Sequence, residues 1–278
     1  MKYGVDVSFW KDFPDWKRAK EFGIEFAIFG ITEINGIDKS FEHNYKGCTE
    51  NNILKGGYKY SYAHDADESR REAQEIINIL QGRPLDLPIF LDLEWDWQKD
   101  NLSKSEIWEI IQAFKKVIKT AGYKFGIYCN LEWYNNIIPD KAKKYDFWIG
   151  YPPVDDVGEY NPYLCPDVPN LICWQYSFNG YVPGIGNGID LDVWCGDADK
   201  DEPEPTTSYN FPKVSYGEKG KIVELLQTVL NAEGAHLDVD GEFGPLTSRA
   251  VSDFQEANNL PVNGVAGSIT WYKLLKRF

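Results

Sequence analysis

The sequence predicts an α/β protein in which a closed barrel of eight strands is followed by a small three-helix domain. Three observations lead to this fold class. Short apolar segments alternate with helical patterns over the first 196 residues, which is typical of a β/α architecture. Helical patterns become sparse in the last third of that region, so we expect the barrel to lack helices on one side. Beyond residue 213 a turn-and-helix motif occurs twice.

The barrel region, residues 1–196, contains the candidate strands and three candidate helices. The helix over Ser103–Ala121 is the most clearly marked, because Ser103 and Glu106 form a capping box and apolar residues follow at helical spacing. Two further helices are predicted over Asp15–Phe22 and Asp67–Leu80. The eight predicted strands, all short apolar runs, are Tyr3–Ser8, Glu25–Ile31, Gly56–Tyr62, Ile89–Leu93, Phe125–Cys129, Phe147–Gly150, Leu171–Tyr176 and Ile189–Val193.

Residues 197–213 are predicted to form a linker. This stretch carries several carboxylates and prolines and has almost no apolar residues before Tyr209. A charged segment of this kind repels itself and stays extended. It divides the chain into a barrel of residues 1–196 and a second domain of residues 214–278.

The second domain contains an internal repeat. The segment Leu237–Gly241, with the glycine and threonine that follow it, recurs as Leu260–Gly264 at an offset of 23 residues. In each copy an Asp-Gly or Asn-Gly pair predicts a tight turn that leads into a helix. The three predicted helices of this domain are Lys221–Ala232, Leu246–Asn258 and Ser268–Lys276.

The net charge of −14 restricts the possible partners. Nucleic acids and anionic membranes both attract basic segments, so we expect neither as a partner. No apolar run reaches 18 residues, which argues against a membrane anchor. The residues after Met1 lack the apolar stretch of a signal peptide, which predicts that the protein is made in the cytoplasm.

The cysteines and histidines form no recognisable metal or nucleophile motif. The five cysteines are odd in number and contain no CxxC pair, so we interpret them as buried free thiols. The three histidines include no HExxH motif. We therefore expect no metal and no cofactor, and carboxylates remain as the chemical groups available in number.

The most informative segment runs from Leu87 to Asp96. Its continuous apolar residues predict a strand in a barrel wall, and Asp92 and Glu94 interrupt them near the C-terminal end. Residues two apart in a strand point to the same side, and active sites of β/α barrels lie at the C-terminal ends of the strands. Two buried acids repel each other, which raises at least one pKa and keeps a proton available for a glycosidic oxygen.

Further acids stand on the first and last predicted strands. Asp6 belongs to the first strand, and Asp190 and Asp192 belong to the last. These two strands are neighbours in a closed barrel, so we expect their acids to border the same opening. Together with Asp92 and Glu94 they predict an acidic catalytic cleft.

At these residues the chain resembles the glycoside hydrolase family 25 muramidases, the Chalaropsis-type lysozymes common among phage endolysins. The resemblance covers about residues 1 to 196, and its strength lies in the order and spacing of its motifs. The matching segments are Gly4–Ser8, Gly23–Ile28, Gly57–Tyr60, Asp92–Glu94, Gly126–Tyr128, Trp174–Tyr176 and Ile189–Leu191.

The resemblance implies a distorted β/α barrel of eight strands and about five helices. It also implies cleavage of the β-1,4 bond between N-acetylmuramic acid and N-acetylglucosamine in peptidoglycan. Glu94 corresponds to the proton donor, Asp92 to its partner, and Asp6 and Asp190 to acids of the cleft, with Asp192 the less favoured of the last-strand pair. Whether an enzymic nucleophile or the acetamido group of the substrate completes the reaction stays open.

Aromatic residues near these motifs are expected to bind the glycan. The predicted set is Tyr60, Tyr62, Trp95, Tyr128, Trp174 and Tyr176. Trp95 and Trp97 follow the catalytic strand directly, and core packing is an equal alternative for both. The chain departs from many relatives at Phe9-Trp10, where those carry a Gln-Gly-like turn, and this difference could alter one subsite.

The C-terminal repeat resembles the peptidoglycan-binding domain 1 family. The matching residues are Leu226-Gln227, Asp240–Gly244, Thr247, Ala250-Val251 and Phe254-Gln255. The implied role is anchoring on the cell wall, which raises the local concentration of the enzyme on an insoluble polymer. A purely stabilising helical domain is the alternative.

Three other functions compete with the muramidase interpretation. A chitinase-like barrel would carry Asp-x-Asp-x-Glu, but Phe90 stands where its first Asp would be. A non-catalytic wall-binding protein would not need the four acids. Cleavage of the peptide stem lacks zinc ligands and a nucleophile motif. The missing signal peptide fits a phage lysin released by a holin, and a bacterial autolysin exported by another path stays open.

Overall fold

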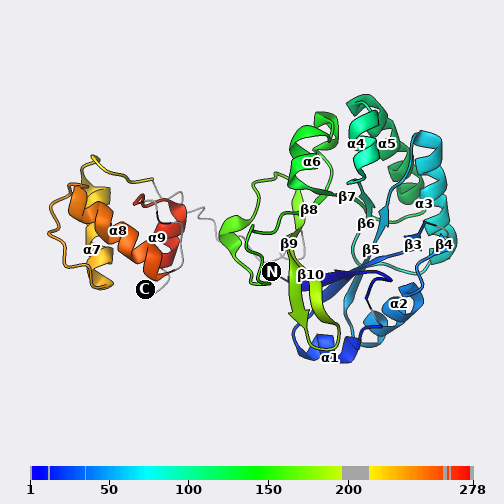
Figure 1. The fold of residues 1–278 in the computed structure, drawn as a ribbon, viewed down its shortest axis with the longest axis horizontal. Helices are drawn as coiled ribbons and strands as arrows, with labels where there is room; N and C mark the ends of the chain where they lie inside the picture. The colour runs from blue at the N-terminus through cyan, green and yellow to red at the C-terminus, as the bar shows by residue number, and fades with distance from the viewer. Residues whose placement is uncertain are drawn as a thin grey trace. The chain divides into compact units, whose positions relative to one another are not determined.

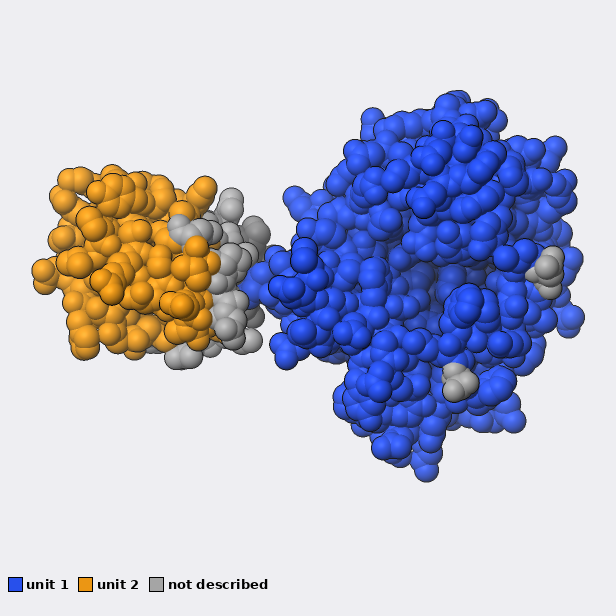
Figure 2. All heavy atoms as spheres, in the orientation of Figure 1, with its two compact units in different colours: residues 1–201 blue, residues 202–278 orange. Residues whose placement is uncertain are grey.

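The computed structural model describes residues 2–11, 13–34, 36–195, 213–258, 262 and 264–275. The chain divides into two compact units, residues 1–201 and residues 202–278, shown in different colours in Figure 2. The predicted linker, residues 197–213, lies outside the described residues except for Lys213. No helix among the described residues is long and apolar enough to cross a membrane.

Eight strands of the first unit close into a barrel, as the sequence predicts (Figure 1). Around the barrel the order is β1-β10-β9-β8-β7-β6-β5-β2. All neighbours run parallel except β10, which is antiparallel to both β9 and β1. The strands are β1 Lys2–Val7, β2 Phe26–Gly30, β5 Leu54–Tyr60, β6 Ile89–Asp92, β7 Phe125–Asn130, β8 Phe147–Gly150, β9 Leu171–Val182 and β10 Gly186–Trp194.

The last two strands are longer than the sequence predicts. β9 and β10 form a hairpin around a short turn, with Val182 paired to Gly186. The sequence between the two predicted strands is rich in glycine and contains Pro183, so it indicates only a loop. This hairpin takes the place of a helical crossover, which explains why helical patterns are sparse in this part of the sequence.

The three predicted helices of the barrel unit are present, and further short elements were not predicted. The predicted helices are α1 Trp16–Glu21, α3 Ala66–Leu80 and α5 Lys104–Thr120, where the Ser103 and Glu106 capping box is formed. Helices of six residues are too short to show a periodic pattern, so the sequence did not reveal two of the others. The elements that were not predicted are α2 Phe41–Glu50, α4 Asp96–Asn101, α6 Leu131–Asn136, β3 Thr32–Glu33 and β4 Gly36–Ile37, together with the 3₁₀ turns Asp140–Ala142 and Pro162–Leu164.

The helix α2 illustrates why a helix of ten residues escaped prediction. Its buried residues Phe41, Asn44 and Cys48 have helical spacing, but only one of them is strongly apolar. The burial of the polar Asn44 side chain is compensated, since its Oδ1 accepts a hydrogen bond from Trp16 Nε1 at 3.2 Å. Gly47 is required in the same helix, since a Cβ there would lie 2.2 Å from the Trp16 ring.

Strand alternation produces two apolar layers in the barrel unit. Ile89 and Leu91 of β6 belong to the outer core, which is packed between strands and helices. Phe90 belongs to an inner cluster with Tyr128 and Trp148 inside the barrel. The inner aromatic rings fill the barrel below the C-terminal end of β6, so polar residues at that end line an open space above a packed floor.

The second unit contains three helices close to the predicted bounds. They are α7 Lys221–Ala232, α8 Pro245–Ala257 and α9 Ser268–Leu275. The sequence repeat corresponds to a repeated contact in which a buried glutamine closes the glycine turn. Gly241 N donates to Gln227 Oε1 at 2.9 Å, and Gly264 N donates to Gln255 Oε1 at 3.0 Å. Both glycines have positive φ, 71° and 65°, which other residues rarely adopt.

Candidate active site

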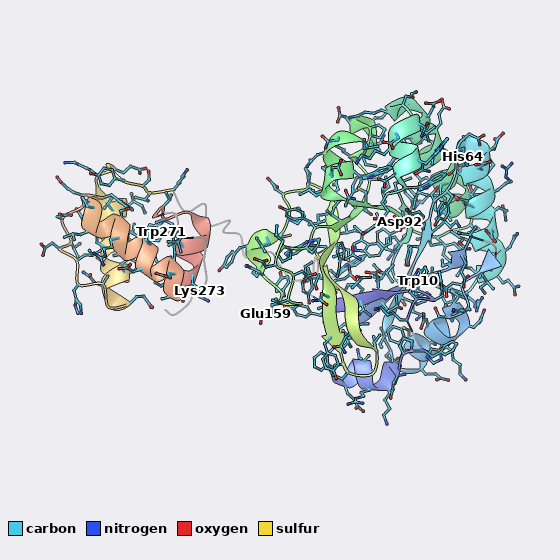
Figure 3. All side chains as sticks on the ribbon, viewed as in Figure 1. Trp10, His64, Asp92, Glu159, Trp271 and Lys273 are labelled. Atoms are coloured by element: carbon cyan, nitrogen blue, oxygen red, sulfur yellow. The ribbon has the colours of Figure 1, made fainter. Side chains whose placement is uncertain are left out.

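The C-terminal ends of the barrel strands surround a cavity of about 790 Å³. Figure 2 shows a hollow on the face of the first unit, and in Figure 3 the labelled Asp92 lies within the barrel. Asp6, Asp92, Glu94 and Asp190, the four acids that the sequence analysis selected, all line this cavity. The fold therefore brings together carboxyls from β1, β6 and β10.

Asp92 and Glu94 face the inside of the barrel because strand alternation continues past the end of β6. Leu91 and Leu93, on the other side of the segment, are buried in the outer core. Asp92 is buried, and its Oδ1 has no hydrogen-bond partner among the described residues. A buried carboxylate oxygen without a partner is costly, which favours the protonated form of this carboxyl.

Burial raises the pKa of both carboxyls of this pair. For Asp92, burial first and the charge of Glu94 next raise the pKa well above its ordinary value, while Lys59 opposes the shift. For Glu94, burial together with the charges of Asp190 and Asp96 raises the pKa to about 7. A carboxyl with a pKa near 7 can still hold a proton at neutral pH and give it to a leaving group.

The acids of the first and last strands lie next to each other. Asp6 is the cross-strand partner of Asp190, while Asp192 is fully buried and does not line the cavity. Asp192 Oδ1 accepts a hydrogen bond of 2.7 Å from Trp148 Nε1. Burial raises the pKa of both Asp6 and Asp192, and the charge of Asp192 raises the pKa of Asp6 further. Two neighbouring carboxyls repel each other when both are charged, so the second proton of the pair is harder to remove.

Gln175 connects these acids to the other side of the barrel. Tyr128 Oη donates to Gln175 Oε1 at 2.6 Å, and Gln175 Nε2 donates to Asp6 Oδ2 at 2.6 Å. The hydrogen bonds fix the orientation of the Gln175 amide, which has one donor and one acceptor side. This network holds Asp6 at the floor of the cavity.

Tyrosines form much of the remaining wall. Tyr60, Tyr62 and Tyr128, which were predicted to bind substrate, line the cavity, and Tyr58 joins them. The Tyr60 and Tyr62 ring centroids are 4.8 Å apart. Tyrosine offers a flat apolar face and a hydroxyl, a combination suited to sugar rings.

Trp95 lies beside the cavity and does not line it. Its ring meets the edge of Tyr62 at 5.4 Å and stacks on Trp97 at 5.2 Å. His64 contacts both tryptophan rings. Trp95 therefore packs in a half-exposed aromatic cluster beside the cavity, and its contact with the glycan stays a prediction.

The structure corrects the expected placement of Trp174 and Tyr176 in the substrate site. Neither lines the cavity, and both belong to the outer core of the barrel unit. Trp174 Nε1 donates to the carbonyl oxygen of Tyr151 at 3.0 Å, and the rings of both residues contact Tyr160. The physical reason is the alternation of β9, which turns Gln175 inward and its two neighbours outward.

Gln175, Trp148 and Tyr58 were missed as site residues. A signal existed for Gln175, because a polar residue between two aromatics on a barrel strand has its best partners in the polar interior. Trp148 is flanked by apolar residues in Phe147–Gly150, so its sequence context gave no preference for either face. Tyr58 and Tyr60 are two residues apart on β5, so their side chains lie on the same face of the strand. The prediction of Tyr60 as a site residue should therefore have included Tyr58.

The cysteines differ in part from the prediction of five buried thiols. Cys48, Cys129 and Cys173 are buried, whereas Cys165 and Cys195 are exposed. Among the described residues no group of three or more histidine, cysteine or acidic side chains is arranged to hold a metal ion.

The second unit has a cavity of its own, of about 600 Å³. It lies between α7 and α8 and includes the turn that follows α7. Apolar Leu230 and Phe254 are combined there with the charged Arg249 and Asp253. Such a mixture of apolar and charged groups is common in ligand-binding sites.

Comparisons with known proteins agree with this division of the chain. The family described as glycosyl hydrolases family 25 matches residues 5–185, and the putative peptidoglycan binding domain family matches residues 219–274. The uncharacterized protein YegX of Escherichia coli K12 is 29% identical over 202 residues, 70% of this chain and 70% of YegX.

Two lysozymes are also similar to the chain. The autolytic lysozyme of Clostridium acetobutylicum is 25% identical over 272 residues, which cover 96% of this chain and 76% of that protein. The crystal structure of the bacterial lysozyme from Streptomyces coelicolor matches with a TM-score of 0.58 and 24% identity, over 72% of this chain and 94% of that one. The structural likeness supports the barrel fold. Because the first family match covers more than half of the sequence and includes three of the four cavity acids, the chain belongs to glycosyl hydrolases family 25.

Proposed function

We propose that this glycosyl hydrolase is a muramidase, which hydrolyses the β-1,4 bond between N-acetylmuramic acid and N-acetylglucosamine in bacterial peptidoglycan. The observation that carries the proposal is the placement of Asp92 and Glu94 side by side in one cavity, with the pKa of Glu94 raised to about 7. A lysozyme related over nearly the whole chain, the autolytic lysozyme of Clostridium acetobutylicum, supports the choice of substrate.

Glu94 is the general acid in this proposal. It is less buried than Asp92, so a glycosidic oxygen that enters the cavity reaches it from the open side. Burial and the charges of Asp190 and Asp96 raise the pKa of Glu94 to about 7, so this carboxyl still holds a proton in part of the molecules at neutral pH. Glu94 gives this proton to the leaving oxygen as the glycosidic bond breaks, and later takes a proton from the attacking water.

Asp92 stabilises the positive charge that develops on the sugar ring, or orients the N-acetyl group beside it. Asp92 lines the same cavity as Glu94, so its carboxyl lies near a sugar ring that is bound there. Asp6 and Asp190 keep the opposite wall of the cavity acidic. An enzymic nucleophile and the substrate's own acetamido oxygen are both compatible with this placement of acids.

The second unit anchors the enzyme on the wall. The match to the peptidoglycan binding domain family and the cavity between α7 and α8 support this role. Anchoring holds the barrel near its polymeric substrate, so a glycan strand that dissociates from the cleft is captured again quickly.

The decisive experiment compares the wild type with Glu94→Gln on purified cell walls. Loss of a general acid lowers the rate by roughly a hundredfold to ten-thousandfold, while sedimentation of the protein with the walls stays unchanged. Mass spectrometry of the released fragments must show new reducing ends at N-acetylmuramic acid. Undiminished clearing by Glu94→Gln excludes the assignment of the acid, and new free amines in place of reducing ends indicate cleavage of the peptide stem.

We also propose that the protein reaches the wall from the cytoplasm through a membrane lesion made by a holin, as a phage endolysin does. Its chemistry supports such control, because a wall-cleaving enzyme must be kept from its substrate until lysis. Expression in a bacterial host with and without a co-expressed holin tests this route. Lysis that needs the holin supports it, and equal lysis without the holin excludes it in favour of export.

A further inference from the structure

We propose that Trp10 is the platform of a glycan-binding subsite on the rim of the cavity, where it contacts a sugar that is remote from the cleaved bond. The inference rests on the proposed muramidase function and adds a residue outside the acid cluster. Trp10 is 79% exposed and yet lines the same cavity as the four acids. A large apolar side chain exposed to this degree at a cleft is typical of a binding surface.

The backbone on both sides of Trp10 is fixed. Phe9 N donates to Asp38 Oδ2 at 2.9 Å, and Lys11 N donates to the carbonyl oxygen of Ser8 at 3.0 Å, which closes a turn. Asp38 itself is buried, and its other oxygen accepts two hydrogen bonds from Ser40. The exposed ring of Trp10 therefore projects from an anchored turn.

Side chains secure the same turn. Lys11 Nζ donates to the carbonyl oxygens of Gly188 and Asn187 in the β9–β10 hairpin. The Phe9 ring packs against Trp10 with centroids 4.4 Å apart, and Lys39 Nζ lies 5.2 Å from the centroid of the Phe9 ring. Because these contacts order the Trp10 backbone before any ligand arrives, binding there costs little conformational entropy.

Two further exposed apolar residues line the cavity together with Trp10. Ile34, between β3 and β4, is 72% exposed, and Phe178 of β9 is 47% exposed. Trp10, Ile34 and Phe178 come from three separate segments, and we call them the apolar rim. In Figure 3 Trp10 and His64, which belongs to the Trp95 cluster, lie on different sides of Asp92.

The occupant of the apolar rim is the continuation of the glycan strand whose bond lies at Glu94. The argument is continuity, because the rim and the acids line one cavity. A β-1,4 glycan presents flat faces of C–H groups, and its N-acetyl methyl groups add apolar surface. Tryptophan covers such faces well, since it offers a large rigid area at low entropic cost.

The test measures the binding of purified peptidoglycan glycan strands to full-length protein in the Glu94→Gln background, where the strands stay intact. Calorimetry with an octasaccharide is expected to show about tenfold weaker binding for Trp10→Ala, a loss of about 1.4 kcal/mol, and a smaller loss for Trp10→Tyr. A tetrasaccharide spans less of the cavity, so the affinity ratio between the parent protein and its Trp10→Ala variant is expected to be smaller than with the octasaccharide.

A matched control is Phe22→Ala, which removes another exposed aromatic ring, 57% exposed, that does not line the cavity. Equal octasaccharide affinity for Trp10→Ala and its parent overturns the inference, as does an equal loss for strands of every length. If the protein forms a concentration-dependent dimer and Trp10→Ala makes it monomeric, the apolar rim binds a second copy of the chain. That result also overturns the glycan-binding inference. Wall clearing by the wild type reports separately on the muramidase function, so the two failures are distinguishable.

Discussion

Gln175 Nε2 lies 2.6 Å from Asp6 Oδ2 and thereby ties β9 to the first strand of the barrel across the floor of the acid cavity. Burial and the charges of Asp192 and Asp190 raise the pKa of Asp6, and this hydrogen bond opposes them. The amide thus limits how much of the Asp6 carboxyl is protonated.

Replacing Gln175 with methionine tests this role. Gln175→Met keeps the length of the side chain and removes the hydrogen bond, so the Asp6 pKa rises further and the carboxyl loses its fixed orientation. We expect kcat to fall by roughly tenfold, as for the loss of one buried hydrogen bond. Steady-state kinetics on soluble glycan strands measures the effect. Tyr128→Phe, which removes the donor to Gln175 Oε1, is expected to give a smaller loss in the same direction.

The pH dependence of hydrolysis follows from the proton on Glu94. The general acid must be protonated, and its pKa is raised to about 7, so kcat/KM is expected to fall as the pH rises through about 7. The charge of Asp190 is one cause of that shift. Asp190→Asn is therefore expected to move the alkaline limb of the profile to lower pH, and a limb that stays in place contradicts the assignment of Glu94.

The stability of the barrel unit is expected to rise as the pH falls from 8 to 5. Asp6, Asp92 and Glu94 have pKa values raised by burial, so the folded chain binds more protons than the unfolded chain in this interval. Their protonated forms stabilise the fold below the unfolded pKa, and this contribution is lost as the pH rises through the folded pKa.

Glu94→Gln isolates one part of this effect. It removes the buried charge, so the variant is expected to be more stable than the wild type at pH 8 by roughly 1–3 kcal/mol and nearly equal to it at pH 4. Chemical denaturation followed by near-ultraviolet circular dichroism measures the difference. A stability difference that is the same at both pH values would show that burial does not raise this pKa.

The buried glutamines of the second unit provide a prediction about anchoring. Gln227 Nε2 donates to Asp240 Oδ1 at 2.8 Å and to Thr247 Oγ1 at 3.1 Å, in addition to the bond that its Oε1 accepts from Gly241. Gln227→Leu removes these three hydrogen bonds, leaves Gly241 N without its acceptor and is expected to destabilise this unit by about 2–4 kcal/mol.

The expected readout is loss of sedimentation with cell walls, while hydrolysis of short soluble strands by the barrel is retained. Thr228→Ala, at an exposed position of the same helix, serves as the control. Equal wall binding by Gln227→Leu and the wild type would contradict the anchoring role of this fold.

Most of the fold could be predicted because apolar patterns determine which segments are strands. The pattern of β6, for example, already shows Leu91 on one face and Phe90 on the other. The full length of the β9–β10 hairpin could not be predicted in this way, because its turn region is rich in glycine and contains a proline. The helix α2 was not predicted because its buried face includes a polar residue, Asn44. This residue acquires its hydrogen-bond partner only in the folded chain.

The site was predictable as far as its acids, and less so for its aromatic residues. Asp92 and Glu94 carry their own signal, since charge is unexpected at the end of an apolar strand. Trp174 and Tyr176 carry none, because an aromatic ring is equally at home in a core and in a sugar site. Whether these two rings face the cavity or the outer core depends only on the alternation of side chains along β9. Because Gln175 points inward, its neighbours Trp174 and Tyr176 point outward.

The closure of the barrel by β1 and β10 has a consequence during translation. Asp6 in β1 emerges from the ribosome early, whereas its cross-strand neighbour Asp190 is in β10, the last strand of the barrel to be synthesised. A nascent chain therefore lacks the complete set of acids until that strand is made. Until then the edges of β1 and β9 are open to other chains, which makes the unfinished barrel prone to aggregation. Completion of the barrel removes both exposed edges and assembles the hydrolytic centre in the same event.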